Sequence, residues 1–225
     1  MSLKLDEAGE DTPLKARLYE PGSRRGEIAE AGVELFFERG YHATGMRDLA
    51  ERLGVTPSAI YNYFPGKEEL LGFILEETMK ALIEEVSAHV DPGADPVEKL
   101  REAIRAHLHF HAIYTKESFV SDSELRGLQG EARQRVIRYR DAYEKVYRDI
   151  LSQGVQSGAF MPLNPKMMTY AIVALCTGVI NWYKPDGPWS LEEIADSYSA
   201  LVIEGLRPRN DTPEPYAGDM SGLPR

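Results

Sequence analysis

Residues 44 to 70 read TGMRDLAERLGVTPSAIYNYFPGKEEL, and this stretch decides the fold. Thr44 can cap a short helix whose apolar residues recur at helical spacing. Gly54 can end that helix in the left-handed conformation, because glycine has no Cβ to resist it. Thr56 and Pro57 then supply the N-cap and the first residue of a second helix. Two short helices joined by a turn of about three residues are typical of a helix-turn-helix.

The second helix carries polar side chains on the face that would point away from the core. Ile60 and Phe64 can face inward, which leaves Tyr61 and Asn62 outward. A phenol and an amide can reach phosphate oxygens or base edges, and a helix N-terminus favours a phosphate. Lys67 adds a positive charge after the Pro-Gly break. We therefore expect this helix to bind DNA, against the alternative of a solvent-exposed helical hairpin with an incidental tyrosine.

The stretch from Arg24 to about Val86 resembles the N-terminal domain of TetR-family transcriptional regulators. The matching residues are Gly40-Tyr41, Thr44, Arg47-Asp48-Leu49-Ala50, Gly54-Val55, Ile60-Tyr61, Tyr63-Phe64 and Lys67-Glu68. The resemblance implies three helices, at residues 24–39, 45–53 and 57–63, the last being the recognition helix. It implies that bases are faced by Arg47, Pro57, Ser58 and Tyr61, and the DNA backbone by Thr44, Asn62, Tyr63 and Lys67. We count Thr56, at the start of the recognition helix, with these DNA-binding residues.

The net charge of −10 opposes DNA binding, because backbone affinity depends on neutralising phosphates. Between residues 24 and 67 the charges balance: six are basic (Arg24, Arg25, Arg39, Arg47, Arg52, Lys67) and six acidic (Glu27, Glu30, Glu34, Glu38, Asp48, Glu51). We therefore expect modest non-specific affinity. Specific binding should depend on dimerisation and on Arg24, Arg25, Arg47 and Lys67 lying on one side.

Helix start and stop signals continue through the rest of the chain, with no strand-like alternation of useful length. We expect helices at residues 67–90, 96–114, 117–127, 131–153, 165–183 and 191–204. The predicted fold is therefore all-α. The predicted organisation is a disordered segment at 1–22, a helix-turn-helix domain at 23–68, a helical domain at 69–206 and a disordered tail at 207–225.

Composition indicates a soluble, cytoplasmic protein without a membrane partner. The chain has 225 residues, is 43% hydrophobic and has no apolar run near the roughly 18 residues of a membrane span. From its charged start, with Lys4, Asp6 and Glu7, we expect no secretory leader. Its single cysteine, Cys176, has apolar neighbours and is expected to be a buried thiol. No nucleophile, base or phosphate-loop motif appears, so we expect neither an enzyme nor a bound cofactor.

The family resemblance also implies an effector pocket within residues 67–183 and a homodimer formed by the last two helices. Those helices carry more apolar surface than one protomer needs. The predicted dimer-interface residues are Met168, Leu175, Val179, Ile194, Tyr198, Leu201 and Val202.

Three histidines, His107, His109 and His111, alternate along one predicted helix. His107 and His111, at i and i+4, could share a metal ion on one helix face. No second ligand pair accompanies them, so we favour pocket lining or a buried core position and expect no metal. A metal-dependent hydrolase built on these two residues is the alternative from a different class.

A second cluster, at residues 133–147, combines four arginines with tyrosines at four-residue spacing. The arginines are Arg133, Arg135, Arg138 and Arg140, and the tyrosines are Tyr139, Tyr143 and Tyr147. One interpretation has the tyrosines in the core and the arginines on a solvated face, paired with Glu131, Asp141 and Glu144. The other makes them one side of a pocket for a ligand that is apolar at one end and anionic at the other.

A narrower resemblance favours the pocket. Residues 119–128, 138–141, 158–160 and 182–187 are similar to a TetR subgroup that controls lipid, sterol and aromatic-acid catabolism and often responds to CoA thioesters. Asn181 departs from it, since that position is often Arg in the subgroup.

We therefore expect a ligand-responsive repressor that binds a palindromic operator as a homodimer and is released by a medium or long acyl-CoA. The expected pocket residues are His107, Phe110, Tyr114, Phe119, Arg126, Arg133, Tyr139, Arg140, Tyr143, Met168, Ile172 and Asn181. Within the same class, the alternative is a repressor of an efflux system that senses lipophilic drugs.

Overall fold

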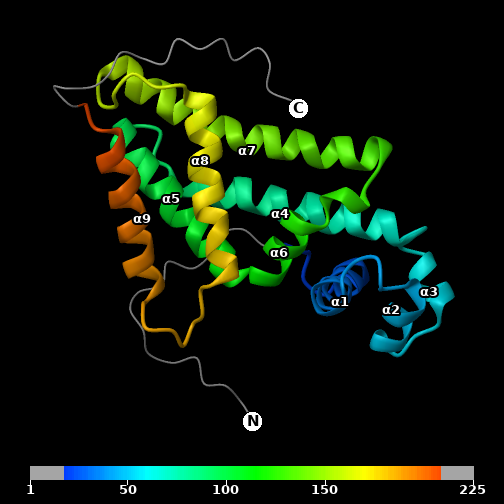
Figure 1. Cartoon of the computed structure of the whole chain (residues 1–225). Coiled ribbons are helices and arrows are strands. Elements are labelled where there is room, and N and C mark those ends of the chain that lie inside the picture. The colour runs from blue at the N-terminus through cyan, green and yellow to red at the C-terminus, as the bar shows by residue number, and fades with distance from the viewer. Residues whose placement is uncertain (1–17, 209–225) are drawn as a thin grey trace.

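The computed structural model describes residues 18–208, and over that range all the regular secondary structure is helical (Figure 1). The all-α prediction is confirmed. The helices are α1 Arg24–Arg39, α2 Met46–Leu53, α3 Pro57–Tyr61, α4 Lys67–His89, α5 Pro96–Ile113, α6 Thr115–Ser123, α7 Gly130–Ser157, α8 Pro165–Thr177 and α9 Leu191–Leu206. Two 3-10 turns, η1 Leu125–Gly127 and η2 Gly178–Asn181, follow α6 and α8.

The first three helices form the predicted helix-turn-helix at one end of α4, and α8 and α9 lie at its other end (Figure 1). Gly54 ends α2 at φ 65°, and the Val55 amide donates to the Ala50 carbonyl at 2.9 Å, so the turn is as expected. The recognition helix α3 is shorter than predicted, because Asn62 ends it. Buried Ile60 holds α3 against the other two helices.

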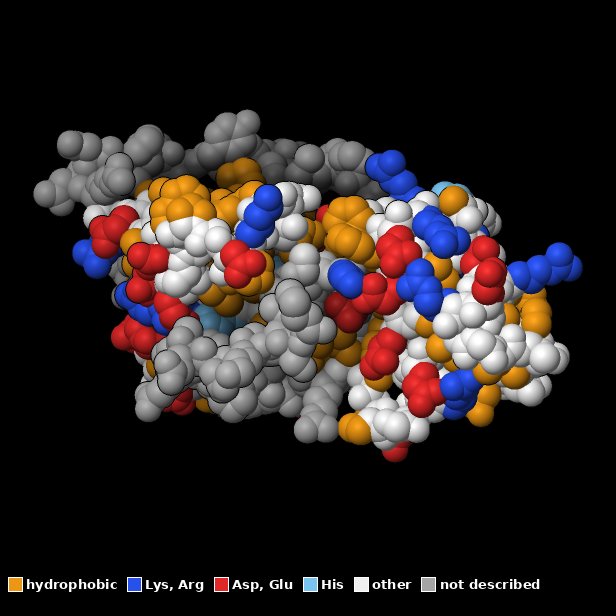
Figure 2. Space-filling model, turned by 90° about the horizontal axis from the view of Figure 1, so that it is seen from below, with side chains coloured by type: hydrophobic (Ala, Val, Ile, Leu, Met, Phe, Trp, Pro, Cys, Tyr) orange, Lys and Arg blue, Asp and Glu red, His pale blue; other side chains and the backbone are white. Residues whose placement is uncertain are grey.

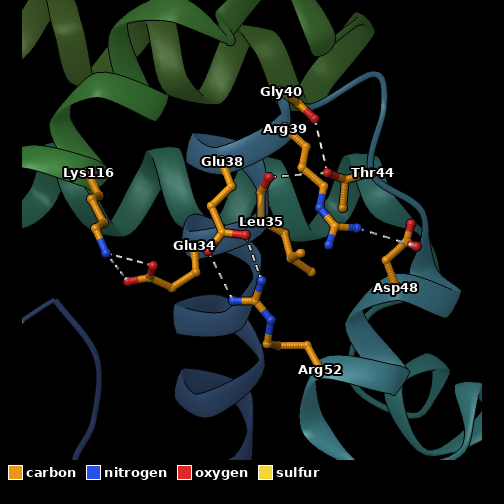
Figure 3. A network of polar contacts seen from close by, with 9 residues as sticks. All are labelled: Glu34, Leu35, Glu38, Arg39, Gly40, Thr44, Asp48, Arg52 and Lys116. Atoms are coloured by element: carbon orange, nitrogen blue, oxygen red, sulfur yellow. Dashed lines mark hydrogen bonds and ion pairs between the residues drawn. The ribbon is translucent and has the colours of Figure 1, made fainter.

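Thr44 does not cap α2, contrary to the prediction. Gly45 is the N-cap residue, and the Asp48 carboxylate accepts from its amide at 2.6 Å. The Thr44 hydroxyl instead donates to the carbonyls of Leu35 and Gly40, at 3.3 and 3.0 Å (Figure 3). Thr44 therefore ties the α1–α2 loop to the end of α1.

Helix α4 belongs to two hydrophobic cores. Its first half, with Leu70 and Ile74, packs in the core of α1–α3, and its second half, with Leu82 and Val86, packs in the core of α5 and α7–α9. The α1–α3 core also takes in Val136 of α7. The two cores thus share α4 and α7. The boundary between the cores lies within these helices, whereas the predicted domain boundary was at residue 68.

Helix α7 runs past the predicted end at Gln153. Gly154 is helical, and the Phe160 ring packs so closely against it that a Cβ there would lie 2.0 Å from Phe160. The helix ends instead at Gly158, with φ 75°. Helix α8 is shorter than predicted, since η2 replaces its last turn.

Part of the predicted N-terminal disordered segment is packed. Leu18 is 5% exposed, and the ring of Tyr19 stacks on Phe73 with centroids 6.0 Å apart. Residues 1–17 and 209–225, the rest of both predicted disordered segments, lie outside the described residues. Cys176 is buried as predicted, and burial raises its thiol pKa to about 12. Within residues 18–208 no helix is both long and apolar enough to cross a bilayer.

Candidate DNA-binding face and effector cavity

The predicted base-facing side chains point outward from α2 and α3. Arg47, Pro57 and Ser58 are exposed, and Tyr61 is 50% exposed beside fully buried Ile60. The expected backbone contacts Asn62 and Tyr63 are also exposed, as is Thr56, whose hydroxyl pairs with that of Ser58 at 2.9 Å. These side chains form one accessible surface on the helix-turn-helix.

Lys67, expected to face the DNA backbone, also makes contacts within the protein. Its ammonium donates to the carbonyls of Tyr41 and Thr44, each at 2.7 Å, and lies 4.3 Å from the centroid of the Tyr41 ring. Thr44 is only 2% exposed, so its side chain cannot reach a phosphate without rearrangement. Both residues hold the α1–α2 loop in place, which positions α2 and α3.

Three of the four basic residues that were expected on one side have partners within the protein, Lys67 among them. Arg24 pairs with Glu27 at 2.5 Å, and the guanidinium of Arg25 lies over the Phe73 ring, 4.4 Å from its centroid. Of the four, Arg47 is exposed and makes no ion pair with residues in the described range.

Ion pairs take up other charges of the helix-turn-helix. Arg52 pairs with Glu38 at 2.7 Å, and Arg39 lies 4.0 Å from Asp48 (Figure 3). Acidic and basic side chains are interspersed over the face at the right of Figure 2, the end that holds α1–α3. This arrangement agrees with the neutral balance counted from the sequence.

A cavity of about 120 Å³ lies among α4, α5, α6, α7 and α8. Its lining residues are Thr78, Met79, Leu82, His107, Phe110, His111, Ser118, Ser121, Asp122, Arg140, Tyr143, Glu144, Val173 and Thr177. Apolar and polar side chains therefore share its wall.

The floor of the cavity is a hydrogen-bonded histidine–tyrosine network. His107 is fully buried, with Nδ1 2.5 Å from the Tyr143 hydroxyl and Nε2 3.3 Å from the Thr177 hydroxyl. The Tyr147 hydroxyl donates to the Ala103 carbonyl at 2.8 Å. Tyr143 and Tyr147 are buried, so both are core residues as the first interpretation of the tyrosines had it, while Tyr143 also lines the cavity.

His111 stacks on His107, with ring centroids 4.2 Å apart. Burial lowers the pKa of His111 to about 4 and that of His107 well below its usual value, so both rings are neutral at pH 7. His111 Nδ1 lies 3.1 Å from the His107 carbonyl and must be the protonated nitrogen, because a carbonyl only accepts.

The geometry gives the metal alternative little to use. Both ring nitrogens of His107 already have hydroxyl partners, and Nδ1 of His111 is committed to the backbone. Within residues 18–208 no three His, Cys, Asp or Glu side chains gather as a potential metal site.

Charged groups gather on one side of the cavity. Arg140 donates to the Ser121 carbonyl at 2.6 Å, and burial lowers its pKa from the usual arginine value, which Asp122 and Glu144 partly oppose. Burial also raises the pKa of Glu144. Asp122 is exposed, so this side is the mouth of the cavity.

Two serine hydroxyls in the wall lack partners. Ser118 and Ser121 are 3% and 5% exposed, and neither Oγ has a hydrogen-bond partner in the described part of the chain. Neither residue was predicted from sequence. The signal available there was the spacing of two small polar residues by three on a helix with apolar neighbours.

Four of the twelve predicted pocket residues line this cavity, namely His107, Phe110, Arg140 and Tyr143. Met168 and Ile172 lie instead in a groove between α8 and α9. Tyr114 packs on the Phe110 ring, Phe119 meets Phe37 of α1, and Tyr139 lies beneath Lys80, while Arg126, Arg133 and Asn181 are exposed. None of these eight side chains lines the cavity.

The arginine cluster divides as well. Arg135 pairs with Glu76 at 2.8 Å, whereas Arg133 and Arg138 are exposed. Arg133 lies close enough to Arg140 to help lower its pKa. Arg133 and Arg138 are thus solvated, and Arg135 pairs with α4 rather than with the predicted partners Glu131, Asp141 and Glu144; of the four arginines, Arg140 alone lines the cavity.

The predicted dimer face is partly available. Met168, Leu175, Leu201 and Val202 line the α8–α9 groove, with Leu201 65% exposed, and Tyr198 is half-buried beside the exposed Trp182. Val179 and Ile194, by contrast, are 0% and 5% exposed. Both lie in the core of α5 and α7–α9, so they cannot contact a partner subunit directly.

Helix α6 contacts both the cavity and the helix-turn-helix. Ser118 and Ser121 face the cavity, whereas Lys116 pairs with Glu34 of α1 at 2.6 Å (Figure 3). Phe119 meets Phe37 of α1 edge-on, with centroids 5.2 Å apart. A ligand that moves α6 would therefore act directly on α1.

Two sequence families match the chain. The family described as "Bacterial regulatory proteins, tetR family" matches residues 28–72, and "Tetracyclin repressor-like, C-terminal domain" matches residues 93–206.

Individual relatives span most of the chain. The HTH-type transcriptional repressor KstR2 of Mycobacterium tuberculosis is 30% identical over 82% of this chain and 93% of its own length. The fatty acid metabolism regulator protein of Bacillus subtilis is 29% identical over 80% of this chain and 94% of its own. A crystal structure of AibR in complex with isovaleryl coenzyme A and operator DNA aligns with a TM-score of 0.75 and 28% identity, covering 80% of this chain and 98% of that one.

Proposed function

Because the chain belongs to the TetR family of bacterial regulatory proteins, we propose that it is a homodimeric, cytoplasmic repressor released from its operator by an acyl-CoA. The matches to the two family models and to KstR2 confirm the family resemblance expected from the sequence. DNA binding is assigned to the exposed face of α2 and α3, and effector binding to the cavity beside α6.

The cavity beside α6 is the observation that carries the proposal. Many of its lining side chains are buried, an arginine is among them, and one of its walls is the helix that pairs with α1. Ligand pockets combine an apolar lining with a few placed polar groups. Arg133, which is exposed and close to Arg140, offers positive charge for the anionic part of a CoA ester outside the cavity, whereas Arg140 itself lies beside the carboxylates of Asp122 and Glu144.

Names of relatives support the same ligand class. One relative is a fatty acid metabolism regulator, and the aligned AibR structure holds isovaleryl coenzyme A. The cavity of about 120 Å³ is small beside the roughly 300 to 1,000 Å³ of pockets that enclose drug-sized ligands. It therefore favours a short acyl group over the medium or long chain expected from the sequence.

The ligand would act through unequal affinity for two conformations of the dimer. If it binds the form with misplaced recognition helices about 100-fold more tightly, the equilibrium shifts by roughly 2.7 kcal/mol. Such a shift is sufficient to lower operator affinity by up to two orders of magnitude.

The test is a panel of butanoyl-, isovaleryl-, octanoyl- and palmitoyl-CoA, titrated by calorimetry and by operator gel shift. We expect the short esters to bind and to free the DNA, and we expect neither free CoA nor the free acids to do so. If no ester binds, or if binding leaves the DNA complex intact, the thioester proposal is wrong. A panel of lipophilic drugs would then test the efflux-repressor alternative.

A further inference from the structure

The unpartnered hydroxyls of Ser118 and Ser121 are the most unusual feature of the cavity. Both side chains are more than nine-tenths buried, and both line the cavity wall. Because they are three residues apart on α6, they lie on one face with Cβ atoms roughly 5 to 6 Å apart. One oxygen atom between them could accept a hydrogen bond from each.

Hydroxyls in this protein usually find a partner on their own helix. Thr78 donates to the Ile74 carbonyl at 2.8 Å, and Ser123, also on α6, donates to the Phe119 carbonyl at 2.8 Å. Ser118 and Ser121 make no such bond within the described residues. A buried hydroxyl without a partner destabilises a protein, so its presence calls for an explanation. A bound ligand that accepts hydrogen bonds from these two hydroxyls would provide one.

A neutral ligand oxygen suits the surroundings better than a carboxylate. His107 and Tyr143 already satisfy each other on the floor, and His111 is a neutral ring with one nitrogen still able to accept. The carboxylates of Asp122 and Glu144 lie beside Arg140, so a further negative charge would meet two like charges. A plain alkyl chain would leave both serine hydroxyls unpaired.

We propose that the effector carries an oxygenated acyl group, whose carbonyl or hydroxyl oxygen accepts hydrogen bonds from Ser118 and Ser121. The inference rests on the proposed acyl-CoA function and narrows its ligand class. Hydroxyacyl and oxoacyl esters should bind more tightly than saturated esters of the same length. A net hydrogen bond contributes about 1 kcal/mol, so two predict a gain of about tenfold or more.

The experiment compares esters matched in length, by calorimetry on the full chain. Butanoyl-CoA is set against 3-hydroxybutanoyl-, acetoacetyl- and succinyl-CoA, and hexanoyl-CoA against 3-hydroxyhexanoyl- and 5-oxohexanoyl-CoA. We expect at least one neutral oxygenated ester to bind about tenfold more tightly than its saturated partner, and we expect succinyl-CoA to show no gain over butanoyl-CoA. The inference is overturned if no oxygenated ester gains at either length, or if succinyl-CoA alone gains.

Variants on α6 identify the donors. The double variant Ser118→Ala, Ser121→Ala should lose the gain, so that oxygenated and saturated esters bind alike. Its apparent melting temperature should be equal to or above that of the wild type, because the unpaired hydroxyls are gone. Ser123→Ala is the matched control, since this exposed serine on the same helix is bonded to the backbone, and it should keep the gain.

The outcomes separate the two proposals. If the double variant lowers affinity for saturated and oxygenated esters equally, the hydroxyls hold the part that all esters share. The inference is then wrong while the acyl-CoA function stands. A melting temperature several degrees lower would mean that the hydroxyls are bonded within the protein, which also contradicts the inference. If no ester binds the wild type, the proposed function itself has failed.

Discussion

Two adjacent side chains of α3, the proposed recognition helix, differ sharply in burial. Ile60 holds α3 to the domain, and this leaves the next side chain, Tyr61, 50% exposed. A phenol in that position contributes an apolar ring and a hydroxyl that can donate or accept at a base edge or a phosphate. Because half of this side chain is outside the core, we propose that it acts in DNA recognition.

Tyr61→Ala should therefore weaken operator binding by about 1 to 3 kcal/mol and relax the preference for base pairs at its contact. Fluorescence anisotropy against the operator and its single-base variants measures both effects. Tyr61→Phe separates the ring from the hydroxyl and serves as the conservative control. If Tyr61→Ala binds every operator as the wild type does, α3 is not positioned as proposed.

Lys67 leads to a different expectation from the one its sequence position suggests. Its ammonium is bonded to the carbonyls of Tyr41 and Thr44, so it positions the loop before α2. We expect Lys67→Ala to lower both thermal stability and operator affinity while leaving the salt dependence of binding nearly unchanged. If the slope of log K against log salt instead falls by about 0.9, Lys67 neutralises a phosphate directly.

The buried histidines predict how stability depends on pH. His111 titrates near 6.5 in the unfolded chain and at about 4 in the folded one, so the unfolded state binds more protons between these values. The stability present above pH 6.5 should therefore be lost as the pH falls toward 4, by about 3 kcal/mol at most. His107, whose pKa is also lowered, acts in the same direction.

Urea unfolding at pH 7, 6 and 5 tests this for wild type and His111→Asn. The stability difference between them should shrink as the pH falls, because only the wild type has to protonate His111. His42→Asn, at an exposed histidine of the α1–α2 loop, is the control. Wild-type and His111→Asn curves that stay parallel over this range would contradict the assignment.

At the scale of elements, the helix-turn-helix was predictable because its signals are local. Gly54 and Pro57 each act on the backbone beside them, whatever the rest of the chain does. The exception was Thr44, whose hydroxyl donates to the carbonyls of Leu35 in α1 and of Gly40 just after it, instead of capping α2. A capping residue can be recognised from sequence, but its competitors for hydrogen bonds cannot.

The cavity was far less predictable, because it depends on which faces of five helices converge. Phe119 looked like a pocket residue, yet it leaves α6 on the side of α1 and meets Phe37. Ser118 is one residue earlier on the same helix and lines the cavity. Successive residues of a helix are rotated by about 100°, so these two side chains lie on different faces of α6. The sequence does not show which of these faces meets the cavity.

Because one face of α6 lines the cavity and another contacts α1, we expect α6 to couple ligand binding to DNA binding. A variant of Lys116 tests this coupling. Its pair with Glu34 is only partly buried, so Lys116→Ala should change the free energy of unfolding by less than about 1 kcal/mol. The ratio of operator affinities without and with saturating acyl-CoA should nevertheless fall several-fold, because one tie between α6 and α1 is lost.

A matched control exists on α7, where Lys145 pairs with Asp149 on an exposed face. Lys145→Ala should leave the affinity ratio at the wild-type value. If Lys116→Ala also leaves it there, the salt bridge carries no coupling. The remaining α6–α1 contact, Phe119 with Phe37, would then be the place to look.

At the scale of the whole molecule, the charge of the chain makes DNA binding depend on dimer formation. The chain carries a net charge of −10, and the helix-turn-helix contributes a neutral balance with few free cations. A single copy should therefore bind DNA weakly, since non-specific affinity comes from neutralised phosphates. Two copies joined by a two-fold axis would place recognition helices in successive major grooves, about 34 to 36 Å apart, and would add their contacts.

The apolar groove between α8 and α9 is where that pairing should occur, and Leu201 is its most exposed large side chain, at 65%. Leu201→Arg should split the dimer, because a charge buried in the interface would have no partner. Each protomer should keep its helical content, since this side chain does not contribute to the core of its own chain. Light scattering at micromolar concentration should then show monomers, and operator affinity should fall by two orders of magnitude or more. Glu84→Arg, on an exposed face of α4, introduces the same side chain away from the groove and should stay dimeric. A wild type that is already monomeric under these conditions would rule out this interface and leave the neutral helix-turn-helix to bind DNA alone.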